Sequence, residues 1–167
     1  GFIGMMILSN VDYKLWKKYS TPICVISIVF LLLVLTPLGI EANGAKRWLG
    51  VGGATFQPSD IAKFACVVFT AKLIEKRYDK IKSLTKGVLP LLLMPILIFV
   101  LIMLEPNMST AGTVILVVFV MLFVAGINMK FVGAMMLSGV GLFVALVIVE
   151  PYRLKRIMSF LDPFQDP

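Results

Sequence analysis

The chain has 167 residues, of which 59% are hydrophobic and only 15% are charged, and its mean hydropathy is +0.98. Soluble domains average about 45–50% apolar and about 25% charged residues, so this composition excludes an ordinary soluble protein. The net charge of +7 would suggest nucleic-acid binding in a soluble chain. Here the cations lie mostly between apolar runs, which membrane topology explains, and no nucleic-acid partner is expected.

Apolar runs close to the roughly 20 residues that cross a bilayer recur along the chain. Residues 1–8 resemble the end of a spanning helix, and residues 9–19 are polar and basic. Pro22 and Pro58 suit helix starts, Pro37 suits a helix end or a kink, and prolines 90 and 95 predict a kink in the third span. Complete spans are expected at 21–40, 58–74, 88–104, 110–127 and 131–149.

These elements predict the fold class and the domain organisation. The fold class is all-α, a polytopic transmembrane helical bundle of about five complete spans plus the end of another. Residues 1–167 form one integral-membrane domain, which we interpret as an internal fragment of a longer protein because no initiator Met or basic signal region opens it.

The distribution of lysine and arginine predicts the orientation. The connections 9–20, 75–87 and 128–130 hold three, five and one of these residues, whereas 41–57, 105–109 and 150–167 hold two, none and three. Because the more basic side of a membrane protein is cytoplasmic, the second set is expected outside. The charge distribution therefore predicts a multi-pass membrane protein with these three connections on the outer side.

Both cysteines, Cys24 and Cys66, lie inside apolar runs without a CxxC motif or a neighbouring histidine. We expect them to be small packing residues rather than redox or metal-binding groups. The chain contains no histidine at all, which excludes His-based catalysis and His metal ligands within this stretch.

The stretch from residue 43 to residue 64 places polar groups at the mouth of the second span. Asp60 and Lys63 are i,i+3 neighbours on one helix, close enough to pair; they form either a structural pair or one wall of a polar cavity for an anionic substrate. Lys46 and Arg47 beside Trp48 resemble a phosphate-contacting pair with an interfacial anchor, although such a pair is more often a lipid headgroup contact.

Two further groups lie on the same expected side. Glu105-Pro106 follows seventeen uncharged residues and is either an ordinary turn or a part of the same site. The run RLKR at 153–156 departs from the basic-inside rule. Its cations either serve a function outside or lie along an interfacial amphipathic helix.

Four motifs in this order and spacing resemble the SEDS family, the shape, elongation, division and sporulation proteins typified by RodA, FtsW and SpoVE. They are NGAKRWL, QPSDIAK, EPNMSTA and RLKRIMSFLDPFQDP, and together they span nearly the whole chain. The chain departs from the family pattern at Asp60, where the family has glutamate, and at Asn107 and Ser109, where it has aspartate and glycine.

The resemblance implies a peptidoglycan glycosyltransferase of the bacterial cytoplasmic (inner) membrane. Such an enzyme polymerises lipid II at the outer face of that membrane during elongation, division or sporulation. The resemblance also implies membrane lipids, the growing glycan strand and a class B penicillin-binding protein as partners. No covalently bound cofactor is expected, and the resemblance allows a divalent cation, Mg or Mn. The family's catalytic aspartate falls beyond Pro167, so neither Asp162 nor Asp166 is assigned that role.

The expected substrate-binding residues are those that match the motifs and supply cations or polar groups on the outer side. No metal ligand is assigned. The set is Lys46, Arg47, Trp48, Gln57, Asp60, Lys63, Glu105, Thr110, Arg153 and Arg156.

Two other functions compete with the glycosyltransferase. A lipid II flippase needs polar groups across the midplane, and the last three spans contain no charged residue, which argues against it. A scaffold for a penicillin-binding protein would use the polar residues for partner contacts.

Overall fold

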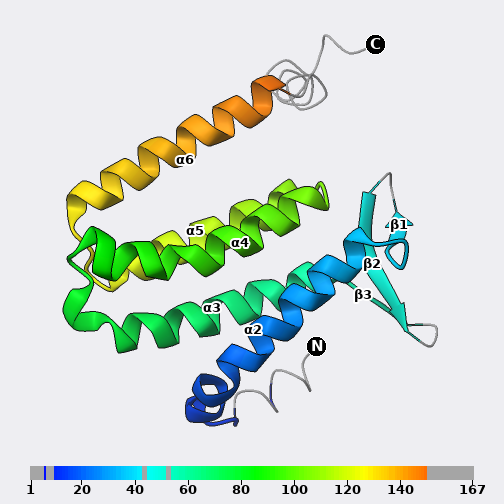
Figure 1. Cartoon of the computed structure of the whole chain (residues 1–167), viewed down its shortest axis with the longest axis horizontal. Helices are drawn as coiled ribbons and strands as arrows, with labels where there is room; N and C mark the ends of the chain where they lie inside the picture. Colours follow the sequence, from blue (N-terminus) through cyan, green and yellow to red (C-terminus); the bar gives the residue numbers. More distant parts are fainter. Residues whose placement is uncertain (1–5, 7–9, 43–44, 52–53, 150–167) are drawn as a thin grey trace. The chain divides into compact units, whose positions relative to one another are not determined.

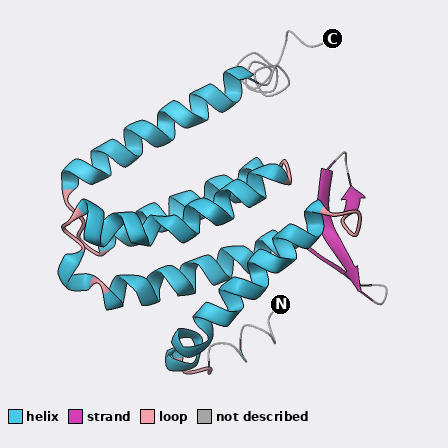
Figure 2. Cartoon of the chain, in the orientation of Figure 1, coloured by secondary structure: helices cyan, strands magenta, loops and turns pink. Residues whose placement is uncertain are grey.

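The computed structural model describes residues 6, 10–42, 45–51 and 54–149, and the chain divides into two compact units, Gly1–Ile127 and Asn128–Pro167. In the first unit, helices and a small sheet follow one another along the chain (Figures 1 and 2). They are α2 (Tyr13–Leu35), β1 (Ile40–Ala42), β2 (Ala45–Val51), β3 (Ala54–Phe56), α3 (Pro58–Lys76), the 3-10 turn η1 (Tyr78–Lys80), the π-helical turn η2 (Leu84–Val88), α4 (Leu89–Leu104) and α5 (Met108–Val124). The second unit contributes α6 (Met129–Val149).

Helix α2 starts eight residues before the expected span of 21–40. The carboxylate of Asp12 caps it by accepting a hydrogen bond from the backbone N–H of Lys14, as N-cap aspartates commonly do. Pro22 therefore lies inside the helix, and its predicted place at a helix start is wrong. The helix ends at Leu35, just before Thr36-Pro37, because proline disfavours helical backbone in the residue before it.

The predicted loop 41–57 is largely a three-stranded antiparallel sheet in the order β1-β2-β3. Glu41 pairs in register with Lys46, and Leu49 pairs with Phe56. The all-α prediction thus missed a small sheet. Aromatic and β-branched residues such as Trp48 of β2 and Thr55 of β3 suit strands, and Asn-Gly and Gly-Gly pairs in the sequence suit hairpin turns.

The remaining helices lie close to their predicted spans. Helix α3 carries Pro58 in its first turn and Asp60 two residues later. Proline suits a helix start, and an acidic side chain interacts favourably with the positive end of the helix dipole. Helix α4 has Pro90 in its first turn and Pro95 inside; the kink expected there stays a prediction. Helix α5 starts two residues earlier than expected because the side chain of Asn107 caps it.

Helix α3 is the central helix of the first unit, since it packs against α2, α4 and α5. Small side chains line its contact with α2, so the two backbones approach closely. Lys17 near the start of α2 and Glu75 near the end of α3 form an ion pair of 2.6 Å. Because the start of one helix lies beside the end of the other, α2 and α3 run antiparallel. The buried small residues are Ser20, Cys24 and Ser27 of α2 with Ala62, Ala65 and Cys66 of α3. Both cysteines are buried and free, which agrees with their predicted role as packing residues.

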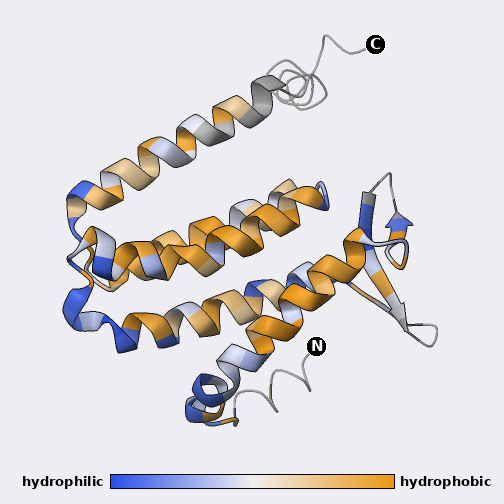
Figure 3. Cartoon of the chain, viewed as in Figure 1, coloured by the Kyte–Doolittle hydropathy of each residue, from blue (hydrophilic) through white to orange (hydrophobic). Residues whose placement is uncertain are grey.

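Apolar side chains cover the outside of the helices as well as the core. Along α2, residues such as Val25 and Leu32 are about half exposed, and Figure 3 shows hydrophobic colour along the helices with polar residues gathered at their ends. Among the described residues, Tyr13–Leu35 and Leu84–Leu104 are long and apolar enough to cross a membrane. Apolar surface on this scale suits lipid rather than water.

The second unit contains helix α6. Its helix α6 has no acidic residue in its first turn and no basic residue in its last. Three of its glycines, at positions 133, 139 and 141, leave open space where a side chain would stand. The RLKR run at 153–156 and both of its predicted site arginines lie outside the described residues.

Candidate functional site: a polar cluster at one end of the first unit

Three parts of the first unit meet at the end that carries the sheet. They are strand β2, the start of α3, and the turn between α4 and α5 (Figure 1). Each part holds one of the sequence motifs, although the motifs are separated by up to 59 residues. The fold therefore gathers groups that the sequence alone placed only on the same side.

Arg47 links the sheet to the α4–α5 turn. Its Nε donates to the backbone oxygen of Glu105 at 3.3 Å, and its Nη2 donates to that of Pro106 at 2.5 Å. Carbonyls at the end of a helix lack partners within the helix, so a guanidinium is a suitable cap for α4. Two of the five N–H groups of the guanidinium are used in this way.

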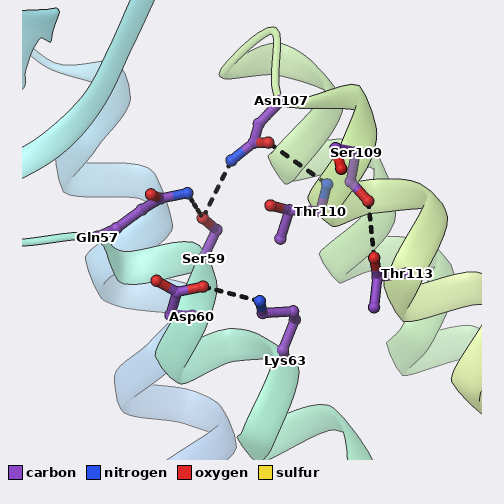
Figure 4. Close-up of polar contacts among 8 residues, drawn as sticks. All are labelled: Gln57, Ser59, Asp60, Lys63, Asn107, Ser109, Thr110 and Thr113. Atoms are coloured by element: carbon purple, nitrogen blue, oxygen red, sulfur yellow. Dashed lines mark hydrogen bonds and ion pairs between the residues drawn. The ribbon is translucent and has the colours of Figure 1, made fainter.

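A second link joins α3 to α5 through Ser59, which is completely buried. Its hydroxyl oxygen accepts a hydrogen bond from Gln57 Nε2 at 2.8 Å and another from Asn107 Nδ2 at 3.4 Å (Figure 4). The other end of the Asn107 amide, Oδ1, accepts from the backbone N–H of Thr110. Gln57 and Thr110 were predicted site residues, whereas Ser59 and Asn107 were not.

The predicted pair of Asp60 and Lys63 is confirmed as a contact. Lys63 Nζ lies 2.8 Å from Asp60 Oδ1, one turn into α3, and the two side chains are 36% and 59% exposed (Figure 4). An exposed pair of this kind contributes only about 0–1 kcal/mol to stability. The lysine is therefore free to exchange this partner for an anionic ligand at little cost.

Glu105 is the most deeply buried charged residue that the structure describes, at 1% exposure. It follows the last residue of α4, and neither carboxylate oxygen has a hydrogen-bond partner among the residues that the structure describes. Burial raises the pKa of this carboxyl to about 7, against the opposing effect of the Arg47 guanidinium. The cluster thus contains a carboxyl that changes charge near neutral pH.

The other predicted residues occupy the edges of this cluster. Lys46 is exposed on β2, and Trp48 on the same strand is partly exposed. No group of three or more His, Cys, Asp or Glu side chains that could hold a metal ion occurs in the described part of the chain. A divalent cation held partly by substrate phosphates, as Mg²⁺ often is, stays a prediction.

The fold and the cluster define a class of protein. It is a helical membrane protein with a polar site that carries lysine and arginine side chains at one end of the helices of the first unit. The FtsW/RodA/SpoVE family, described as cell cycle proteins, matches the chain over residues 1–167. The chain belongs to this family, and the family resemblance noted from its motifs is confirmed.

Relatives within the family are similar along the whole chain. The probable peptidoglycan glycosyltransferase FtsW of Geobacter sp. (strain M18) is 39% identical over 168 residues, which are 100% of this chain and 46% of that protein. Stage V sporulation protein E of Bacillus subtilis (strain 168) is 39% identical over 171 residues, again 100% of this chain and 46% of the relative. The chain spans about half the length of these relatives.

Solved structures share the fold. A structure described as a peptidoglycan synthase complex that coordinates polymerisation and crosslinking matches with a TM-score of 0.72 and 30% identity, over 97% of this chain and 48% of the other. The crystal structure of the rod shape determining protein RodA of Thermus thermophilus matches with a TM-score of 0.66 and 29% identity, over 82% and 46%. These likenesses support a helical membrane protein.

Proposed function

We propose that the intact protein is a peptidoglycan glycosyltransferase that polymerises lipid II at the outer face of the cytoplasmic membrane. The observation that carries the proposal is the gathering of Arg47, Lys63 and the α4–α5 turn, with its buried Glu105, at one end of a membrane-embedded unit. Relatives named as probable peptidoglycan glycosyltransferases support it. The finer topology, about five complete spans with 41–57, 105–109 and 150–167 outside, belongs to the same proposal.

The chemistry assigns these residues to binding rather than to proton transfer. In this reaction the 4-hydroxyl of one lipid-linked sugar attacks the anomeric carbon of another and displaces a polyprenyl diphosphate. Cations must neutralise the departing diphosphate. Lys63 and the N–H groups of Arg47 that face no described residue supply that charge, with Lys46, Arg153 and Arg156 as further contributors.

The remaining predicted residues orient the substrate or the site. Gln57, Glu105 and Thr110 shape the polar mouth, Trp48 anchors it at the membrane interface, and Asp60 holds Lys63 when no ligand is bound. The catalytic base is expected beyond Pro167. A class B penicillin-binding protein is the proposed partner, and the similarity to a peptidoglycan synthase complex supports it.

The test uses the full-length protein with its partner in liposomes that contain lipid II. We expect Lys63→Ala to lower glycan polymer yield by at least about tenfold, because the variant lacks a positive charge that stabilises the departing diphosphate. Lys82→Ala is the matched control, because Lys82 is exposed near the opposite end of α3, and it should leave the yield unchanged. Full polymer yield from Lys63→Ala would contradict the assigned role.

Arg47→Ala tests the same site with a different expectation. Because Arg47 also holds the α4–α5 turn, its loss should lower both polymer yield and thermal stability. Movement of labelled lipid II across the bilayer without any polymer would instead favour the flippase. Loss of partner binding with catalysis intact would favour the scaffold.

A further inference from the structure

The arrangement of Glu105 and Arg47 has a feature that substrate binding alone does not require. Arg47 donates to the backbone oxygens of residues 105 and 106, and neither oxygen of the Glu105 carboxylate is hydrogen-bonded to it or to any other described group. The two side chains are thus close enough to interact electrostatically without forming a hydrogen-bonded pair. Such a buried carboxyl can take up or lose a proton without breaking a hydrogen bond.

No other described charge in the surrounding elements takes over this interaction. The last turn of α4 and the first turn of α5 contain no charged residue. On α3, Asp60 and Lys63 neutralise each other, and on the sheet Glu41 lies opposite Lys46. The net charge of Arg47 and its surroundings therefore depends mainly on whether Glu105 is ionised.

We propose that Glu105 controls the affinity of this site for an anionic ligand, because binding of a diphosphate at Arg47 is coupled to uptake of one proton by Glu105. The Arg47 guanidinium is positively charged in both states. When the Glu105 carboxyl is protonated, no negative charge offsets the guanidinium; when Glu105 is ionised, the negative charge of its carboxylate does. The proton comes from solvent and resides on a carboxyl oxygen, and no covalent bond to the ligand forms. This inference rests on the proposed function of the site.

Linkage fixes the direction of the effect. The carboxyl of Glu105 has a pKa of about 7 in the ligand-free protein, and a bound anion beside Arg47 stabilises the protonated form and raises that pKa further. Affinity is therefore greatest below the ligand-free pKa and falls as pH rises above it, by at most about tenfold per pH unit.

The test measures the Kd of lipid II for the full-length protein in detergent micelles from about pH 6 to about pH 8.5. Lipid II is a suitable probe because its diphosphate is a diester and stays ionised across this range. We expect wild-type affinity to fall by about tenfold over the range, and the affinity of Glu105→Gln to stay level. Glu41→Gln, an exposed carboxylate on β1, should retain the wild-type pH dependence.

Infrared spectroscopy provides a measurement that needs no binding. The carbonyl stretch of a buried protonated carboxyl should be present in wild type at about pH 6, disappear through about pH 7, and be missing from Glu105→Gln. With lipid II bound, it should persist to higher pH. If Glu105→Gln does not fold, the wild-type spectra still decide the matter.

The outcomes separate this inference from the proposed function. Wild-type binding that does not change with pH, or a carboxyl band unaffected by lipid II, would overturn the coupling even if the protein polymerises lipid II. If lipid II binding weakens as pH rises but the protein makes no polymer, the coupling to Glu105 would be supported and the proposed polymerase activity refuted. Absence of lipid II binding at every pH would overturn both.

Discussion

Asn107 shows how one side chain joins two helices at this site. Its Nδ2 donates to Ser59 on α3, and its Oδ1 accepts from the backbone of Thr110 on α5. Because the amide has a donor at one end and an acceptor at the other, it fills both roles at once. The family pattern has aspartate at this position, which can accept from both groups only if the Ser59 hydroxyl turns to donate.

The substitutions at Asn107 should therefore differ in stability. Asn107→Ala removes the cap of α5 and a hydrogen bond to a buried hydroxyl, and should cost about 1–2 kcal/mol. Asn107→Asp keeps both contacts with the direction of one reversed, and should cost less than half of that. Thermal unfolding of the purified full-length protein would measure the difference, and equal losses would contradict the proposed hydrogen bonds.

At the scale of elements, the turn between α2 and β1 sets the position of the sheet. The position where Gly39 would carry a Cβ lies 2.1 Å from the backbone oxygen of Val34, a separation that no side chain tolerates without movement of the backbone. Gly39 thus allows the chain to fold back tightly after α2. The sheet that follows carries Arg47 toward the α4–α5 turn.

Gly39→Ala should therefore displace the sheet and destabilise the protein by about 1–3 kcal/mol. The matched control is Gly112→Ala on α5, where an added Cβ meets nothing within 4 Å and stability should change little. Differential scanning calorimetry of the two variants would compare them. A transition temperature for Gly39→Ala equal to that of the wild type would show that the turn relaxes without strain.

Local patterns predicted the helices better than the contacts between them. Pro58 and Asp60 placed the start of α3 correctly, and the i,i+3 spacing predicted the Asp60–Lys63 pair. The sheet was missed even though the sequence contains Asn-Gly at 43–44 and Gly-Gly at 52–53, pairs that often signal a hairpin. The predicted start of α2 near Pro22 was wrong because the Asp12 side chain already caps the helix before Tyr13.

The site itself was predictable only in part. The family resemblance selected Arg47, Gln57 and Glu105, but no local pattern identifies Ser59 as a shared acceptor, because its partner Asn107 is 48 residues away. The lack of partners for Glu105 is also a property of three-dimensional packing. Sequence spacing carries no information on which buried oxygens remain unsatisfied.

At the scale of the first unit, polar groups of different kinds occupy its two ends. The sheet and the site lie at one end, whereas Lys17, Glu75 and the turn that contains Lys82 lie at the other. Apolar surface covers the helices between them. The basic-inside rule assigns the Lys82 end to the cytoplasm, which gives the proposed orientation a direct test.

Single-cysteine reporters would perform this test in the full-length protein with any exposed cysteines removed. Cys24 and Cys66 are at most 1% exposed and should add little background. A membrane-impermeant maleimide added to intact spheroplasts should label Thr55→Cys, which is exposed on β3, and should label Lys82→Cys only after lysis. The reverse pattern would overturn the orientation and, with it, the outer-face reaction.

The bond between Arg47 and the backbone of Glu105 also constrains the order in which the protein matures. The two residues are 58 positions apart, so at translation rates of about 5–20 residues per second the arginine is made roughly 3–12 s before its acceptor. During that interval the ribosome synthesises α3 and α4. The strands can pair early, but the site closes only when the α4–α5 turn reaches them, which makes this contact a late step in biogenesis.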